Sequence, residues 1–214
     1  MNELLMQISE AIQKGKKKQV QTLVPQAIEA GLSAQEILND GLLHGMNIIG
    51  DKFTRNEVFV PEVLVSARAM NTGTELLKPL LAEEGAEPVG KACIGTVAGD
   101  LHDIGKNIVR MMLESKNFEV IDLGSDVPAD EFIKCAVEND CKLICCSALL
   151  STTMPVMGEV VEKAKEAGIR DKVVIMIGGA PVTQSFCDKI GADAYTPDAA
   201  SCAVKAVELV SKIA

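Results

Sequence analysis

A short polar segment places a carboxylate beside an imidazole. Asp100 and His102 lie in residues 100–105, between an apolar stretch at 92–97 and a segment ending at Leu113 whose apolar residues recur at helical spacing. The apolar stretch predicts a buried parallel strand, so His102 is expected at its carboxyl end, where open α/β sheets bind ligands. Asp100 is close enough to orient one imidazole nitrogen. That arrangement is typical of a metal-ligating histidine.

A phosphate-binding loop is the main alternative for this glycine-containing turn. Its motif requires four residues between two glycines, followed by Lys and Ser or Thr. Here five residues separate Gly99 from Gly105, and Asn107 stands where a hydroxyl residue would hold magnesium. The spacing therefore disfavours a phosphate loop.

From residue 91 onward, strand and helix patterns alternate. The predicted strands are 91–97, 118–123, 141–147, 172–177 and 193–195, with a last helix at 198–212. This rhythm predicts a flavodoxin-like (Rossmann-type) α/β domain over 91–214, with a five-stranded parallel sheet of order 2-1-3-4-5 and helices on both faces. The first and third strands flank its topological switch point, so the His102 turn and the residues after Ser147 should converge there.

Residues 1–83 have helical periodicity throughout. Gly15 and Gly31 interrupt it, Ser33 to Glu36 form a capping-box signature, and Pro61 stands near the start of a last helix. These signals predict a four-helix bundle as a separate helical cap domain. The charged segment 84–90, with its Gly and Pro, is the predicted linker, about which hinge motion is expected.

Composition excludes several classes of function. The 214 residues are 48% hydrophobic, with one Tyr and no Trp, so the cores are aliphatic. A net charge of −9 argues against nucleic-acid binding. Residues 1–12 lack a secretory pattern, and no stretch reaches the ~18 apolar residues of a membrane span, so we expect a cytoplasmic protein without a membrane partner.

The seven cysteines do not predict a disulfide framework, because their number is odd and no secretory signal precedes them. Cys141, Cys145 and Cys146 are close in sequence and could suggest zinc. However, Cys145 and Cys146 are adjacent in a predicted strand, so their side chains point to opposite faces. We expect buried structural thiols.

Residues 95–109, with their Asp-x-His-x-x-Gly core, resemble the cobalamin-binding block of methionine synthase and of corrinoid methyl-carrier proteins of methylotrophic methyltransferase systems. The resemblance covers nearly the whole chain and implies cobalamin, as methylcobalamin, cob(I)alamin or a related corrinoid, as the cofactor. It implies that His102 ligates the cobalt in place of the cofactor's own base. Asp100 and a hydroxyl residue complete the relay; the alignment gives Thr153, with Ser151 and Thr152 near enough to take its place.

The same resemblance implies the other cofactor contacts. Small residues should line a slot for the cofactor's nucleotide tail, and the segment from Tyr195 should close over it, although Asp198 is also a plausible helix N-cap. The implied cofactor-binding set is Thr96, Asp100, Leu101, His102, Asp103, Ile104, Gly105, Ser147, Leu149, Thr152, Thr153, Gly178, Gly179, Tyr195, Asp198 and Ala199.

In the helical half, residues 59–70 resemble the segment that caps the upper face of the ring. Phe59, Val63 and Met70 are the expected cap residues, although core packing alone accounts for Val63 and Met70 about as well. We assign no role to His44, the second histidine of the chain.

The implied function is that of a methyl carrier in one-carbon metabolism, such as methanogenesis or acetogenesis, which is not expected to be catalytic alone. Its partners would be a substrate-specific methyltransferase, an acceptor methyltransferase delivering the methyl group to a thiol or tetrahydrofolate, and a reductive activation protein. Methylamines, betaines, methanol and methoxyaromatics all remain open as donors. A cobalamin-dependent sensor is the alternative, disfavoured by the absence of Trp. A phosphoacceptor receiver is disfavoured because Ser147 stands where receivers place an aspartate.

Overall fold

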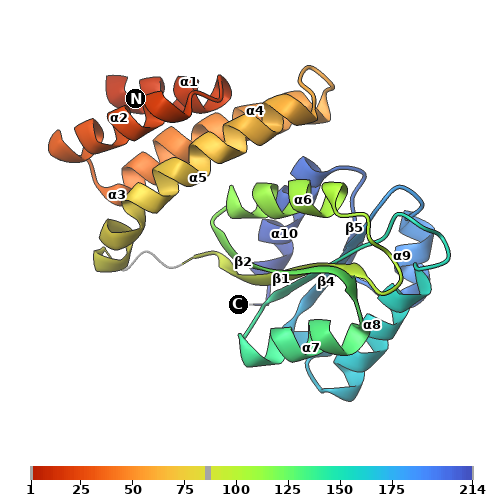
Figure 1. The fold of residues 1–214 in the computed structure, drawn as a ribbon. Helices are drawn as coiled ribbons and strands as arrows, with labels where there is room; N and C mark the ends of the chain where they lie inside the picture. Colours follow the sequence, from red (N-terminus) through yellow and green to blue (C-terminus); the bar gives the residue numbers. More distant parts are fainter. Residues whose placement is uncertain (1, 85–87, 214) are drawn as a thin grey trace. The chain divides into compact units, whose positions relative to one another are not determined.

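The computed structural model describes residues 2–84 and 88–213. They form two compact units, Met1–Glu87 and Pro88–Ala214, which are described separately (Figure 1). Within the described residues, no helix combines the length and apolar character that crossing a membrane requires.

The first unit is built from four helical segments. Its helices are α1 (Glu3–Gln13), α2 (Lys17–Glu29), α3 (Ala34–Glu36), η1 (Ile37–Leu43), α4 (His44–Thr54) and α5 (Val60–Glu83), of which α3, η1 and α4 follow one another without a break. The predicted capping box at Ser33 is present, and Gly15 and Gly31 end the first two helices with φ of 60° and 83°. The sequence did not predict that η1 is a π-helix.

Close packing of α1 against the third segment depends on two glycines. A Cβ at Gly45 would lie 2.6 Å from the carbonyl oxygen of Ser9, and one at Gly41 would lie 3.1 Å from Ile8. The missing side chains let the two backbones approach. The largest fully buried side chains of this unit are Ile8, Ile12, Ile37, Leu42, Met46, Ile49, Met70 and Leu77.

The second unit is a parallel sheet with helices on both faces. Its strands are β1 (Gly90–Val97), β2 (Phe118–Val127), β3 (Leu143–Ser147), β4 (Val174–Gly178) and β5 (Ala194–Tyr195). Their order is β2-β1-β3-β4-β5, which confirms the predicted topology. The helices are α6 (Ile104–Glu114), α7 (Ala129–Glu138), α8 (Pro155–Glu166), η2 (Arg170–Lys172), α9 (Gln184–Ile190) and α10 (Ala199–Val210). Helices α6 and α10 cover one face, and α7 and α8 the other (Figure 1).

The strand bounds differ from the prediction where the backbone is irregular. Strand β2 continues to Val127 instead of ending at residue 123, because Gly124 and Asp126 adopt positive φ and keep the chain in the sheet through two register shifts. Strand β4 starts at Val174, because η2 occupies residues 170–172. Glycine and aspartate are typical of turns, so the bulged end of β2 has the sequence pattern of a strand end.

The connection between the units falls partly outside the described residues. Glu84 accepts hydrogen bonds from the amides of Ala34 and Gln35 at 2.8 and 3.1 Å. On the other side, the Val89 amide donates to Asn117 at 2.9 Å, and Gly90 begins β1. Residues 85–87 are not described, and the linker at 84–90 stays a prediction.

Candidate functional site

The turn between β1 and α6 is organised around the buried carboxylate of Asp100. This side chain has no solvent exposure. Its Oδ1 accepts hydrogen bonds from Nδ1 of His102 at 2.8 Å and from the His102 amide at 3.1 Å. Its Oδ2 accepts from the amides of Leu149 and Leu150, at 2.7 and 3.1 Å, and from the hydroxyl of Thr153 at 3.1 Å. Two loops, after β1 and after β3, therefore meet on one carboxylate.

These donors decide the charge of Asp100. Burial on its own raises a carboxyl pKa, because it disfavours the charged form. Here the hydrogen bonds from His102, Leu149 and Leu150 outweigh burial and hold the pKa of Asp100 well below its usual range. Asp100 is thus a fixed carboxylate at neutral pH, suited to orient the imidazole through its Nδ1–H.

The other side of the His102 ring is open. The side chain is 54% exposed, and among the described residues no hydrogen bond reaches Nε2. In a neutral imidazole, an Nδ1–H bonded to a carboxylate leaves the lone pair on Nε2, which is the arrangement of a metal-ligating histidine. Around it four large apolar side chains face solvent: Leu101, Ile104, Leu149 and Leu150 are 76%, 74%, 44% and 40% exposed. Such an apolar patch is suited to cover a large, flat ligand.

The structure distinguishes the three hydroxyl residues that the sequence left open. Thr153 is the one whose side chain reaches Asp100, and it is nearly buried. Its hydroxyl also lies 2.9 Å from the Leu150 carbonyl oxygen, so its single proton is shared between two acceptors. Ser151 and Thr152 are exposed in the same turn.

Small residues form a row across the carboxyl ends of three strands. The register pairs Thr96 of β1 with Ser147 of β3, and Ser147 with Gly178 of β4. A Cβ at Gly178 would meet no atom within 4 Å, which leaves open space above the row. Gly179 has φ of 137°, and its Cβ would lie 1.8 Å from the Ala148 carbonyl oxygen, so only glycine fits there.

Other residues of the implied set have structural partners. The Thr96 hydroxyl donates to the His102 carbonyl at 3.0 Å, while Asp103 accepts from the Asn107 side chain at 3.1 Å. Gly105 is exposed, with open space around its Cβ position. Asp198 is the N-cap of α10, as the sequence also suggested, and it accepts from the Ser201 amide.

The last members of the set lie at the far edge of the sheet. Tyr195 is half-buried on β5, and Ala199 is buried in the first turn of α10. Contact of these two residues with a cofactor stays a prediction.

A buried ion pair next to the turn was missed by sequence reasoning. Lys106, 2% exposed, places Nζ at 2.6 and 2.7 Å from the two carboxylate oxygens of Asp122 on β2. Arg110 also donates to Asp122, at 3.0 Å. This pair fastens the first turn of α6 to the sheet. A charged residue within the apolar run of β2 was the available signal.

The three expected cap residues differ in exposure. Phe59, just before α5, is 65% exposed, whereas Val63 and Met70 are buried. Their role as a cap stays a prediction. His44, which had no predicted role, lies 2.9 Å through Nδ1 from the hydroxyl of the buried Ser9 and thereby joins α4 to α1.

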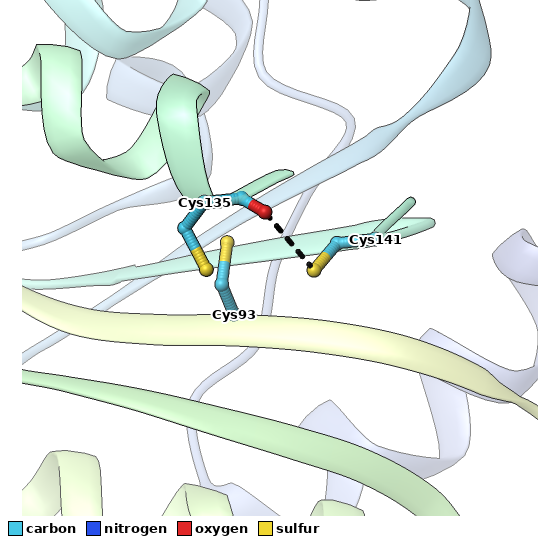
Figure 2. A group of neighbouring side chains, drawn as sticks. All are labelled: Cys93, Cys135 and Cys141. Atoms are coloured by element: carbon cyan, nitrogen blue, oxygen red, sulfur yellow. Dashed lines mark hydrogen bonds between the residues drawn. The ribbon is translucent and has the colours of Figure 1, made fainter. Parts of the chain in front are cut away.

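All seven cysteines are free and buried. Cys141 lies with Cys93 of β1 and Cys135 of α7, and the three sulfur atoms are within 4.8 Å of one another (Figure 2). Cys141 donates to the carbonyl oxygen of Cys135 at 3.9 Å. Hydrogen bonding with Cys141 and burial both raise the pKa of Cys93, which keeps that thiol neutral in the apolar core. Cys141 precedes β3, so this group is near the opposite end of the sheet from His102.

Comparisons with known proteins match both units. A family described as B12 binding domain matches residues 90–204, and a second with the same description matches residues 4–78. Dimethylamine corrinoid protein 1 of Methanosarcina acetivorans is 45% identical over 210 residues, which are 98% of each chain. Trimethylamine corrinoid protein 1 of the same organism is 41% identical over 213 residues, covering 99% of this chain and 95% of the relative.

A solved structure gives the same result. A chain in the crystal structure of the methanol:cobalamin methyltransferase complex of Methanosarcina barkeri matches with a TM-score of 0.86 and 32% identity, over 98% of this chain and 80% of that one. The likeness confirms the helical unit followed by a Rossmann-like sheet. The shared cofactor is cobalamin. With matches over nearly its full length, the chain belongs to the family of B12-binding corrinoid proteins.

Proposed function

We propose that this corrinoid protein carries a methyl group between two methyltransferases, with His102 as the protein ligand of the cobalt. The observation that carries the ligand assignment is the 2.8 Å hydrogen bond between Asp100 and Nδ1 of His102, which leaves Nε2 directed to solvent. Bound cobalamin supplies the cobalt centre that takes up and releases the methyl group. The chain's residues bind, orient and shield that centre.

The residues around His102 fit a corrinoid. The exposed Leu101, Ile104, Leu149 and Leu150 provide apolar surface for the ring, and their exposure to water is unfavourable without a partner. The open space at Gly178, next to Ser147, suits the nucleotide tail, because a planar base needs close approach to the backbone. The donor set, one imidazole nitrogen oriented by a carboxylate, suits a cobalt ion.

Asp100 and Thr153 would tune the strength of the imidazole donor. A carboxylate on Nδ1–H makes Nε2 a better donor to a metal. The Thr153 hydroxyl removes part of the negative charge from Oδ2 of the same carboxylate at 3.1 Å. A proton gained or lost along Asp100, His102 and Thr153 would therefore change how firmly His102 holds the cofactor.

We further propose dimethylamine as the methyl donor. The support is the 45% identity to a dimethylamine corrinoid protein over 98% of each chain. The expected partners are a dimethylamine-specific methyltransferase, a second methyltransferase with a thiol acceptor, and a reductive activation protein. Tetrahydrofolate is the alternative acceptor.

The test is a reconstituted transfer assay. The holoprotein is mixed with the dimethylamine-, trimethylamine- or methanol-specific methyltransferase of Methanosarcina barkeri, an acceptor methyltransferase, a thiol and a reducing system. We expect monomethylamine and methylated thiol in equal amounts, only with dimethylamine and its methyltransferase. The His102→Ala holoprotein, compared with the parent by visible spectroscopy, tests whether His102 ligates the cobalt.

Two outcomes separate the parts of this proposal. Transfer from another donor with none from dimethylamine contradicts the donor assignment but leaves the carrier function. An unchanged visible spectrum of the His102→Ala holoprotein removes His102 from the cobalt.

A further inference from the structure

The carboxyl end of β2 is irregular beside the His102 turn. Ile94 of β1 pairs with Asp122, but the next pairs are Gly95 with Gly124 and Val97 with Val127. Strand β2 therefore contains two more residues than β1 over this stretch, which makes two bulges. Bulges at the end of a strand re-aim side chains and are frequent beside functional sites.

The second bulge contains Asp126 in a left-handed conformation, with φ of 59°. Among the described residues, the other non-glycine positions with positive φ are Asn56, Asn117 and Asp140. Those three follow the ends of α4, α6 and α7, where left-handed residues commonly terminate helices. Asp126 differs from them because it lies within a strand, so helix termination does not explain its backbone.

Asp126 makes two contacts with the turn that carries His102. Its Oδ1 accepts a hydrogen bond from the Gly99 amide at 2.7 Å. Its own amide donates to the main-chain carbonyl of Asp100 at 3.0 Å. The side chain and the backbone of one residue, in the left-handed conformation, thus hold Gly99 and Asp100.

We propose that Asp126 is a positioning residue, which acts through the Asp100 backbone to set the place of the His102 ring. The inference rests on the proposed ligation of cobalt by His102. Asp100 has its carboxylate fixed by Leu149, Leu150 and Thr153 on one side. Asp126 fixes the backbone of the same residue on the other side, so the Asp100–His102 unit is held at both ends.

Two substitutions at Asp126 separate positioning from folding. Asp126→Gly removes the side-chain acceptor while permitting positive φ without strain, so the fold should remain stable. Asp126→Asn keeps a side-chain oxygen and tolerates the same backbone, so it should restore the behaviour of the parent protein. Asp140→Gly is the matched control, because it relaxes an aspartate of similar φ, 52°, that follows α7.

The first readout uses the protein without cofactor. The Leu149 amide donates to Oδ2 of Asp100 and not to Asp126, so its hydrogen exchange reports the position of the Asp100 carboxylate. We expect Asp126→Gly to speed this exchange about tenfold, because losing one hydrogen bond to a carboxylate costs about the free energy that corresponds to a tenfold change. Asp126→Asn and Asp140→Gly should stay near the parent rate, with melting temperatures close to the parent in all three.

The second readout is the nitrogen hyperfine splitting of the divalent-cobalt holoprotein, which should weaken in Asp126→Gly and persist in Asp126→Asn. If the parent protein lacks this splitting, the proposed ligation fails, and the exchange experiment still decides whether Asp126 positions Asp100. Unchanged exchange and splitting in Asp126→Gly overturn the inference. A general fall in melting temperature with no selective change at Leu149 also overturns it, because it indicates a structural role alone.

Discussion

Asp100 and Cys93 are both fully buried near β1, yet burial has opposite net results at the two sites. At Asp100 burial raises the pKa, but hydrogen bonds from the side chain and amide of His102 and from the amides of Leu149 and Leu150 outweigh it and lower the pKa, so the charged form is stabilised. At Cys93 hydrogen bonding with Cys141 adds to burial and raises the pKa, so the neutral form is stabilised. The difference shows that the donors around a buried group, more than its depth, decide its charge. The carboxyl end of the sheet therefore holds a buried charge beside His102, whereas the three thiols are part of the neutral core.

Removing the charge of Asp100 should cause the largest change in the free energy of unfolding. Asp100→Asn replaces one acceptor oxygen with an NH₂ group that faces existing donors, so we expect a loss of about 3 kcal/mol in the free energy of unfolding. Cys93→Ala removes a small apolar group and should cost about 1 kcal/mol. Urea unfolding of the protein without cofactor measures both. Equal losses would contradict the distinction between the two sites.

Acid should weaken the Asp100 site. The pKa of Asp100 is lower in the folded protein than in the unfolded chain. The charged carboxylate therefore contributes to the free energy of unfolding above the unfolded pKa of about 4, and this contribution is lost as pH falls through the folded pKa. The stability gap between the parent and Asp100→Asn should therefore shrink as pH falls below about 4. Urea midpoints at a series of pH values check this. A gap that stays constant into acid indicates that the charge contributes nothing.

Alkali should weaken the thiol site by a smaller amount. Because the pKa of Cys93 is raised in the folded protein, the thiol ionises first in the unfolded chain. The contribution of the neutral thiol to the free energy of unfolding is therefore full below the unfolded pKa of about 8.5 and falls as pH rises beyond it. Cys93→Ala should flatten this alkaline decline, measured by thermal unfolding across the same range. Cys187→Ala should flatten the decline as well, because burial also raises the pKa of Cys187. An alkaline decline that is unchanged in Cys93→Ala would contradict the claim that the fold stabilises the neutral Cys93 thiol.

The smallest effect is expected at Thr153. Thr153→Val keeps the shape and removes one hydrogen bond to Asp100, so the loss should be about 1 kcal/mol. Thr152→Val, in the exposed neighbouring position, should stay within about 0.5 kcal/mol of the parent. Urea unfolding measures both variants. A larger loss of stability in Thr152→Val than in Thr153→Val would contradict the choice of Thr153 as the hydroxyl partner of Asp100.

The sequence predicted much of the architecture, because the signals were local. Apolar runs of strand length alternate with helical periodicity, and these gave the sheet order and the place of the His102 turn. The capping box at Ser33 and the N-cap at Asp198 depend on side chains within three residues of their partners. Such contacts are readable without tertiary information.

The contacts that sequence reasoning missed join residues far apart in the chain. Lys106 pairs with Asp122, and Asp126 holds Gly99, across the interface of β1, β2 and α6. Cys141 lies beside Cys93 and Cys135, whereas its neighbours in sequence, Cys145 and Cys146, had suggested a different group. A charged residue such as Asp122 within an apolar run indicates that a partner exists, but composition and spacing do not identify that partner, because the pairing depends on strand register and bulges.

The amino-acid sequence by itself determined which residues could ligate and where the sheet would present them, since periodicity and turn chemistry act over a few residues. Only the tertiary structure decided that Asp100 is a buried carboxylate with five donors and that Thr153 is the hydroxyl that reaches it. The physical reason is that hydrogen-bond geometry and burial arise when the loops after β1 and β3 meet. That meeting depends on how the strands pair.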